Sequence, residues 1–319
     1  MTTMDIDLAR IEQAAATIDP VFLNTPQYVD DRLSEALRRT VTVKLETANP
    51  IRSFKGRGAD FLLRHLEPRG KVVCASAGNF GQAMAYCGRS HGIPVEVFVA
   101  ASINPDKRAR MEALGATVTV AGPDGASARA AAEDYASRNP GVRCLQDGRE
   151  VRVAEGAGTI GRELAAIDDL EAVVVPVGDG ALINGIGTWF KAKRPNVRVI
   201  GVNAKGAASM RESLRAGRAV SVPEVDTFAD GISIQTPFDV AVRRAREVVD
   251  EILLVDDEQI GAAMTLAART LGVLLEPAAA AGLAAIAAGD VAQRRVATVL
   301  TGANPRPEQV RALAAELAR

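Results

Sequence analysis

Short apolar runs alternate with stretches of helical periodicity along most of the chain. Residues 5–18 carry apolar side chains at helical spacing and are followed by Pro20, which predicts an N-terminal helix. Apolar runs typical of buried strands follow at residues 41–45, 72–75, 95–99, 117–120 and 142–145. Helices are predicted between these strands at residues 58–66, 81–91, 105–114 and 126–138. Strands separated by helices in this way form parallel sheets through right-handed crossovers, so we predict an α/β fold.

A second series of the same kind begins near Gly158. Its strands are predicted at residues 173–177, 197–202, 252–255 and 296–300, again with helices between them. We therefore expect two lobes, each built on its own parallel sheet. A small domain is predicted at residues 71–147 and a large domain at residues 1–70 and 148–319, because a site near Lys55 must face elements of both series. The default binding site in such a chain is the cleft between the lobes, at the carboxyl ends of the strands.

The composition narrows the possible functions. The chain has 319 residues, a formal net charge of -1 and 4% aromatic residues, which is typical of a soluble globular protein and offers little to nucleic acid. The most apolar stretch, residues 278–288, is about half as long as a membrane-spanning helix. Residues 1–10 lack the apolar core of a signal peptide. We therefore expect a cytoplasmic protein with no nucleic-acid partner and no membrane partner.

The few cysteines and histidines argue against several catalytic classes. Cys74, Cys87 and Cys144 are odd in number and unrelated in spacing, which favours reduced thiols over disulfides or a zinc site. His65 and His91 are the only histidines, so histidine-based triads and zinc hydrolases are disfavoured. We interpret both histidines as structural or exposed.

Several predicted strand ends carry residues suited to chemistry. Lys55 lies between an aromatic residue and a glycine where the strand at 41–45 gives way to a helix, although a lysine there is usually a solvated surface residue. Residues 76–79 open the helix after the next strand, and their small side chains let backbone amides approach an anion such as a carboxylate. Residues 301–304 follow the last strand and offer one neutral hydroxyl.

The glycine-rich turn at residues 178–182 also follows a strand and opens a helix. Its pattern fits either a plain tight turn or a phosphate cradle made of backbone N–H groups. A dinucleotide fingerprint fails here, because Ile183 stands where a third glycine is needed and Asn203 where an acidic residue is needed. A nicotinamide-dependent oxidoreductase is therefore a poor fit.

Six motifs occur along the chain in a recognisable order. They are Ser53-Phe54-Lys55-Gly56-Arg57-Gly58-Ala59, Ser76-Ala77-Gly78-Asn79, Val175-Pro176-Val177-Gly178, Ala229-Asp230-Gly231-Ile232, Glu276-Pro277-Ala278 and Thr301-Gly302-Ala303-Asn304. Together they resemble the threonine and serine dehydratases (ammonia-lyases) and the related serine racemases. The resemblance covers nearly the whole chain and implies the two-lobed fold type II of pyridoxal-phosphate enzymes, similar to the β chain of tryptophan synthase, with pyridoxal 5'-phosphate as cofactor.

The resemblance also implies roles for individual residues. Lys55 is the implied catalytic residue, because its amine would carry the cofactor and then take the substrate's α-proton. Phe54 would lie against the ring, Asn79 would bond the ring oxygen and Thr301 would meet the ring nitrogen. The implied cofactor contacts are Phe54, Lys55, Asn79, Gly178, Asp179, Gly180, Ala181, Leu182 and Thr301. The implied substrate contacts are Ser53, Ser76, Ala77, Gly78 and Asn79.

The expected reaction is the dehydration of a small 3-hydroxy amino acid, L-threonine or L-serine first, to a 2-keto acid and ammonia. A neutral hydroxyl at the ring nitrogen makes a weaker electron sink than a carboxylate, which favours prompt loss of the β-hydroxyl. A racemase is disfavoured because Ala77 stands where serine racemases carry a serine, and alanine cannot exchange a proton. A β-replacement synthase and a non-catalytic relative remain open, and a homodimer is expected because relatives are commonly dimers.

Some positions depart from the family pattern. Asp179 replaces a glycine. A carboxylate about 5 Å from a phosphate raises the energy by roughly 3 kcal/mol at an effective dielectric constant near 20. This repulsion exceeds the stabilisation of up to about 2 kcal/mol that a helix N-terminus gives an anion. Asp179 must therefore point away or be offset by a cation, and we expect its amide rather than its side chain to contribute.

Other departures concern the substrate and regulation. Arg52 follows Ile51 where Thr-Gly is common, and we hypothesise that it pairs with an acidic group, as in 3-hydroxyaspartate. A phenylalanine, Phe80, replaces a common histidine. Asn203 and Ser209 stand where racemases have acidic ligands, so no metal site is predicted. The chain ends without the regulatory domain of feedback-inhibited relatives, and isoleucine control is not expected.

Overall fold

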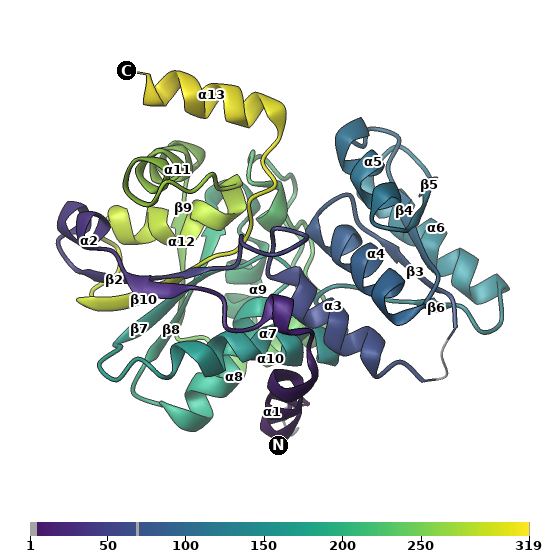
Figure 1. The fold of residues 1–319 in the computed structure, drawn as a ribbon, viewed down its shortest axis with the longest axis horizontal. Coiled ribbons are helices and arrows are strands. Elements are labelled where there is room, and N and C mark those ends of the chain that lie inside the picture. The colour runs from purple at the N-terminus through teal and green to yellow at the C-terminus, as the bar shows by residue number, and fades with distance from the viewer. Residues whose placement is uncertain (1–4, 68–69, 319) are drawn as a thin grey trace.

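The protein folds around two separate sheets, as seen in a computed structural model that describes residues 5–67 and 70–318 (Figure 1). The larger sheet has six strands in the order β1, β2, β10, β7, β8, β9, and the smaller has four in the order β5, β4, β3, β6. All neighbouring strands are parallel except β1 and β2. The strands are β1 (Gln27–Val29), β2 (Thr40–Leu45), β3 (Val72–Ala75), β4 (Val95–Val99), β5 (Thr117–Val120), β6 (Arg143–Cys144), β7 (Ala172–Pro176), β8 (Arg198–Ala204), β9 (Glu251–Val255) and β10 (Arg295–Leu300).

Helices connect most of the strands and cover the faces of both sheets (Figure 1). They are α1 (Leu8–Thr17), α2 (Asp31–Leu37), α3 (Lys55–Arg64), α4 (Asn79–His91), α5 (Pro105–Ala113), α6 (Gly125–Arg138), α7 (Val151–Leu164), α8 (Ala181–Lys193), α9 (Ser209–Ala216), α10 (Asp239–Val248), α11 (Asp257–Leu271), α12 (Pro277–Ala287) and α13 (Pro307–Leu317). Short 3-10 turns lie at Pro20–Phe22, Lys205–Ala207 and Asp230–Ile232. None of the helices in the described residues is long and apolar enough to cross a membrane.

The predicted α/β alternation is confirmed, with each predicted strand found within two residues of its expected ends. Three elements were missed: β1 and α2, which lie between the entry helix and the first predicted strand, and α13, which follows the last predicted strand. The helix that carries Lys55 begins at Lys55 itself rather than at Gly58. The strands predicted within residues 71–147 form a sheet of their own, while the exact domain boundaries stay a prediction.

Small residues bring the helices of the larger lobe into close contact. Helix α12 is buried along its length and packs on β7, β8, β9 and β10. At the crossing of α7 and α8, a Cβ atom on Gly185 would lie only 2.0 Å from the carbonyl oxygen of Ala154. Glycine is therefore required at this crossing, which fixes the position of α8 and of the loop that precedes it.

Helix α3 belongs to the interior of both lobes, because it packs on α4 of the smaller lobe and on α7 of the larger one. Beneath it lies a buried group of charges. The guanidinium of Arg57 pairs with Glu46 at 2.8 Å and with Glu163 at 2.6 Å, and Lys44 also pairs with Glu163 at 2.5 Å. These ion pairs connect the helix that begins at the candidate catalytic lysine to Glu46 and to α7 of the larger lobe.

Candidate active site

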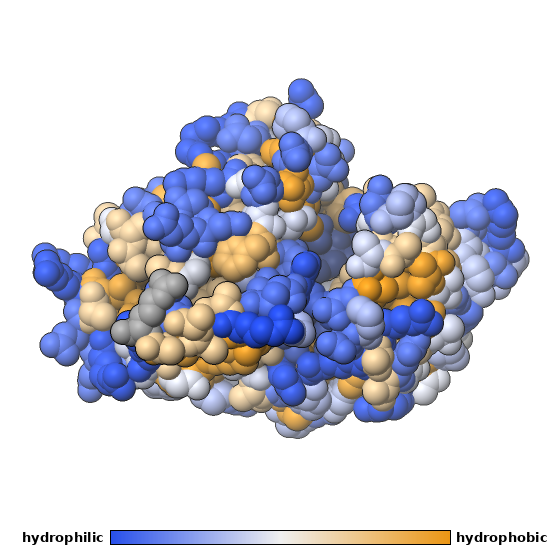
Figure 2. All heavy atoms as spheres, turned by 90° about the horizontal axis from the view of Figure 1, so that it is seen from above, coloured by the Kyte–Doolittle hydropathy of each residue, from blue (hydrophilic) through white to orange (hydrophobic). Residues whose placement is uncertain are grey.

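The carboxyl ends of strands from both sheets converge on one cleft of about 710 Å³. Figure 2 shows the surface hollowed between the larger body of the molecule and the smaller lobe. Most of the residues that the sequence singled out line this cleft: Phe54, Lys55, Ser76, Ala77, Gly78, Asn79, Gly178, Asp179, Gly180, Ala181, Leu182 and Thr301. The strand-end rule for parallel sheets thus brings together segments that lie far apart in the sequence.

Lys55 is held at the cleft by backbone contacts to the end of β10. Ser53 forms an isolated bridge with Gly302, and the amide of Phe54 donates to the carbonyl of Thr301 at 3.1 Å. The Lys55 amine lies 4.7 Å from the centre of the Phe54 ring and forms an ion pair with Asp147. The lysine, the aromatic ring and the Thr301 hydroxyl are therefore parts of one local structure.

The loop at residues 76–79, which we call the carboxylate loop, ends β3 and starts α4. Gly78 is the N-terminal cap residue of α4 and provides no side-chain cap. The first amides of a helix have no partner within the helix, so they remain available to an anion in the cleft. Ala77 is exposed at this point, and its methyl group can bind no proton.

The side chain of Asn79 is held by two partners from the larger lobe. Its Nδ2 atom donates to Glu276 Oε1 at 2.7 Å, and its Oδ1 atom accepts from Asn304 Nδ2 at 2.8 Å. Burial raises the pKa of Glu276 to about 7, the charge of Asp230 adds to the rise, and a hydrogen bond from the Asn304 amide opposes it. Among the residues that the structure describes, Glu276 takes one of the two N–H groups of Asn79, so the other can donate to a further acceptor, as the predicted bond to a cofactor oxygen requires.

The loop at residues 178–182, which we call the phosphate loop, joins β7 to α8. Gly180 has a φ of 91°, a conformation that L side chains rarely adopt, and it caps α8 without any side-chain hydrogen bond. A Cβ atom on Gly178 would lie 2.9 Å from the carbonyl oxygen of Gly231. The loop therefore needs its glycines, and it turns the open amides of a buried helix toward the cleft, as a phosphate site requires.

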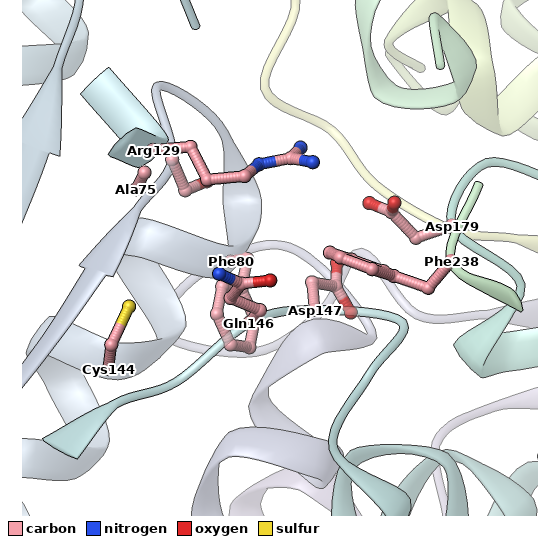
Figure 3. Close-up of a pocket in the computed structure, with 9 residues that line it drawn as sticks. Ala75, Phe80, Arg129, Cys144, Gln146, Asp147, Asp179 and Phe238 are labelled. Atoms are coloured by element: carbon pink, nitrogen blue, oxygen red, sulfur yellow. The ribbon is translucent and has the colours of Figure 1, made fainter. Parts of the chain in front are cut away.

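Asp179 is the member of the phosphate loop that fits least easily. Its side chain lines the cleft rather than pointing away, and its Oδ1 atom is buried without a hydrogen-bond partner in the described residues. Burial raises the pKa of Asp179 to about 7, the charge of Asp147 adds to the rise, and Lys55 and Arg129 oppose it. Figure 3 shows the Arg129 guanidinium on the opposite side of a small cavity, turned toward this carboxyl group.

Sequence reasoning missed Asp147, Arg129 and a role for Glu276. Asp147 follows β6, so the strand-end rule that found Lys55 could have found it too. Glu276 was recognised as part of a motif, but nothing in the sequence showed that it would be buried beside Asn79. Arg129 lies within a predicted helix, and only the tertiary structure turns it into the cleft.

Some of the residues singled out do not reach the cleft. Ser53 is buried behind it, and its hydroxyl lies 3.4 Å from the Lys55 amide that donates to it. Arg52 is exposed and is not among the residues that line the cleft, so the structure gives no support to its hypothesised contact with an acidic substrate. Asn203 is buried and donates to the Val177 carbonyl at 2.7 Å, which stabilises the strand before the phosphate loop.

The described residues fit pyridoxal phosphate. They provide a lysine amine, a glycine-lined helix N-terminus for the phosphate and a neutral hydroxyl at Thr301, all facing one cleft. Gly180, the N-terminal cap residue of α8, makes no side-chain hydrogen bond, so the first amides of this helix are open. A group that accepts hydrogen bonds and bears negative charge would satisfy the open amides.

Comparisons with known proteins agree with this geometry. A family model described as pyridoxal-phosphate dependent enzyme matches residues 18–302. An L-threonine ammonia-lyase of Thermotoga maritima is 35% identical over 304 residues, covering 94% of this chain and 76% of that protein. Threonine deaminase isoform 2 of Solanum lycopersicum, in its processed form, has a TM-score of 0.88 at 30% identity, covering 98% of this chain and 94% of that chain. Maize serine racemase has a TM-score of 0.90 at 24% identity, covering 98% of both chains, and this likeness shows the fold alone. The chain therefore belongs to the family of pyridoxal-phosphate dependent enzymes.

Proposed function

We propose that the protein is an ammonia-lyase that eliminates water from L-threonine or L-serine, the α-proton and the β-hydroxyl both leaving, after which hydrolysis of the unsaturated product by water yields a 2-keto acid and ammonia. The observation that carries the proposal is the position of the Lys55 amine, in one cleft with the open amides of α4 and of α8. The likeness to an L-threonine ammonia-lyase over 94% of the chain supports the substrate class.

Each part of the site has a proposed task. The carboxylate loop binds the substrate carboxylate through its amides, which orients the α-carbon toward Lys55. Lys55 would hold the cofactor, and its amine would be the base that takes the substrate's α-proton. Bound pyridoxal phosphate supplies the electron sink for this proton removal. Asp147, which pairs with the Lys55 amine, would accept a hydrogen bond from that amine while it carries the proton.

We further propose that residues 71–147 act as a small domain that brings the carboxylate loop to a large domain formed by residues 1–70 and 148–319. The separate four-stranded sheet supports this division. Limited proteolysis tests it, because we expect cleavage to be confined to the junctions near residues 70 and 147 and to be slowed by substrate.

We also propose a cytoplasmic homodimer. The absence of a membrane-spanning helix from the described residues is compatible with this location. Light scattering coupled to gel filtration tests the oligomeric state, and fractionation of cells that express the full chain tests the location.

Ala77 separates dehydration from racemisation. A racemase needs an acid or base on the face of the substrate opposite Lys55, and Ala77 provides none. Chiral chromatography after incubation with L-serine should show loss of L-serine without accumulation of D-serine. Accumulation of D-serine as the main product would contradict the proposal.

The direct test measures keto acid released from L-threonine, L-serine and 3-hydroxyaspartate by cofactor-loaded protein. We expect turnover of the first two, and a loss of about 10²–10⁴-fold or more in Lys55→Ala together with loss of the protein's yellow colour. Product that forms only after a thiol or amine is added would instead identify a β-replacement synthase. A colourless protein without turnover would identify a non-catalytic relative.

A further inference from the structure

Asp179 is a carboxyl group inside a loop proposed to hold phosphate, and its direction is fixed. Gly148 packs against it so closely that a Cβ atom on Gly148 would lie 2.7 Å from the Asp179 Cβ. Gly148 also has a φ of 77°, so a side chain is disfavoured there on both grounds. The Asp179 carboxyl is thereby held toward the cavity with Oδ1 buried and unpartnered among the described residues.

Arg129 faces Asp179 from the other lobe. It lies on α6 and lines both the cleft and a small cavity of about 70 Å³ in which Asp179 also lies. Its guanidinium is 5.3 Å from the centre of the Phe238 ring and makes no hydrogen bond or ion pair within residues 5–67 and 70–318. Figure 3 shows the guanidinium and the carboxyl group turned toward each other across the cavity.

The other charges that face Asp179 are already engaged with each other. Asp147, from the segment after β6, is paired with Lys55, at the start of α3. Of the two described cations that act on Asp179, Lys55 and Arg129, the second is therefore the one without an ion-pair partner. A phosphate brings about 1.5 to 2 negative charges, which a second ionised carboxylate in the same loop would repel.

We propose that Asp179, in its protonated form, donates a hydrogen bond to the cofactor phosphate while Arg129 pairs with the same phosphate from across the cleft. This inference rests on the proposed role of residues 178–182 as the phosphate loop. In this arrangement Asp179 donates a hydrogen bond to the phosphate instead of repelling it, and α6 of the smaller lobe becomes part of the cofactor site through Arg129. Burial and the neighbouring Asp147 raise the pKa of Asp179 to about 7, which is the direction that a donor role requires.

The test compares two ligands, pyridoxamine 5'-phosphate and pyridoxamine, by calorimetric titration of the cofactor-free full chain. Neither ligand has an aldehyde, so neither can bond covalently to Lys55. The ratio of their affinities isolates the phosphate contribution, and solution ionisation of the phosphate is nearly complete above pH 7 because its second pKa is about 6.

In the wild type we expect this ratio to fall by up to about tenfold per pH unit above pH 7, as Asp179 loses the proton that the phosphate needs. In Asp179→Asn the amide still donates but does not titrate, so the ratio should stay high and flat. In Arg129→Gln the ratio should fall by about tenfold or more at every pH, since hydrogen bonds to charged groups are the stronger kind. Arg138→Gln is the matched control, because Arg138 lies on the same helix with its side chain 75% exposed. Unchanged pyridoxamine affinity checks that each variant is folded.

The inference is overturned if Asp179→Asn keeps the wild-type pH slope, or if Arg129→Gln leaves the ratio unchanged. Weaker binding of an acidic substrate, rather than of the phosphate, in Arg129→Gln would assign Arg129 to the substrate instead and would also overturn it. If the wild type binds neither ligand, the proposed function fails together with this inference. If both ligands bind but the ratio of their affinities does not respond to pH or to the substitutions, this inference fails while the proposed function stands.

Discussion

Replacing Gly185 with alanine tests whether the close crossing of α7 and α8 holds the phosphate loop in place. A methyl group there would lie 2.0 Å from the Ala154 carbonyl oxygen and 2.7 Å from the Gly158 amide nitrogen. To bring the first distance to an ordinary contact, the two backbones must separate by about 1 Å or more. Because both contacts are with backbone atoms, no side-chain rotation can relieve the overlap.

The magnitude follows from two opposing terms. Overpacking a tight interface costs about 1–3 kcal/mol, while replacing a helical glycine with alanine returns about 0.5–1 kcal/mol. Because the overlap is with backbone atoms, the upper part of the overpacking range, about 2–3 kcal/mol, applies, so we expect Gly185→Ala to lower the free energy of unfolding by about 1–2.5 kcal/mol, measured by urea denaturation. Since α8 begins at the phosphate loop, a shift of this size should also weaken binding of pyridoxamine 5'-phosphate more than binding of pyridoxamine.

Gly261 provides the matched control. It lies inside α11, and a Cβ atom there would meet nothing within 4 Å. Gly261→Ala should therefore raise the free energy of unfolding by about 0.5–1 kcal/mol and leave cofactor affinity unchanged. The reasoning is refuted if Gly185→Ala is as stable as the wild type, or if the two substitutions have the same sign.

Three further predictions concern Glu276, Arg52 and Lys55. Because burial raises the pKa of Glu276 to about 7, the folded state binds more protons than the unfolded state between pH 4.5 and 7, so this group's contribution to stability falls as pH rises through that range. Glu276→Gln should become more stable relative to the wild type over the same range, by at most about 3 kcal/mol, and a pH-independent difference in denaturation midpoints would contradict this. Arg52 has a φ of 51° and is exposed, so Arg52→Gly should raise the free energy of unfolding by up to about 1 kcal/mol. The same substitution should leave the ranking of threonine, serine and 3-hydroxyaspartate in the keto-acid assay unchanged. A changed ranking would support the hypothesised contact of Arg52 with the substrate. Lys55→Ala should retain affinity for pyridoxamine 5'-phosphate while losing turnover, and loss of both would indicate a structural role.

The fold was largely predictable because buried parallel strands are apolar runs and the connecting helices have a regular period. Strand β1 was not predicted because it is an edge strand in which Tyr28 and Val29 are exposed, so its sequence lacks the apolar run of a buried strand. The sequence predicts the start of the second series near Gly158, whereas α7 begins at Val151. The glycines of α7 look like loop residues in the sequence, but Gly156 and Gly158 serve close packing against α3 and α8.

The candidate site was predictable only in the segments that directly follow a strand. Lys55, the carboxylate loop and the phosphate loop each follow a strand, so their convergence follows from the parallel topology. Arg129 and Glu276 reach the cleft through tertiary packing, which no local pattern records. Arg52 lies three residues before Lys55 in the sequence, which suggested a contact with substrate, but it is not among the residues that line the cleft.

Helix α3 explains why this site depends on both lobes. Its first residue is Lys55, and two residues later Arg57 pairs with Glu46, just after the end of β2, and with Glu163 of α7. Breaking one partner of such a network typically costs about 3–5 kcal/mol, whereas apolar residues of similar volume can stabilise as well, so stability alone does not account for it. Apolar packing would not fix the orientation of α3 in the same way. A forked guanidinium held by two carboxylates leaves the helix little freedom to slide or rotate. The position of the Lys55 amine is therefore set by charges behind the helix as much as by Asp147 in front of it.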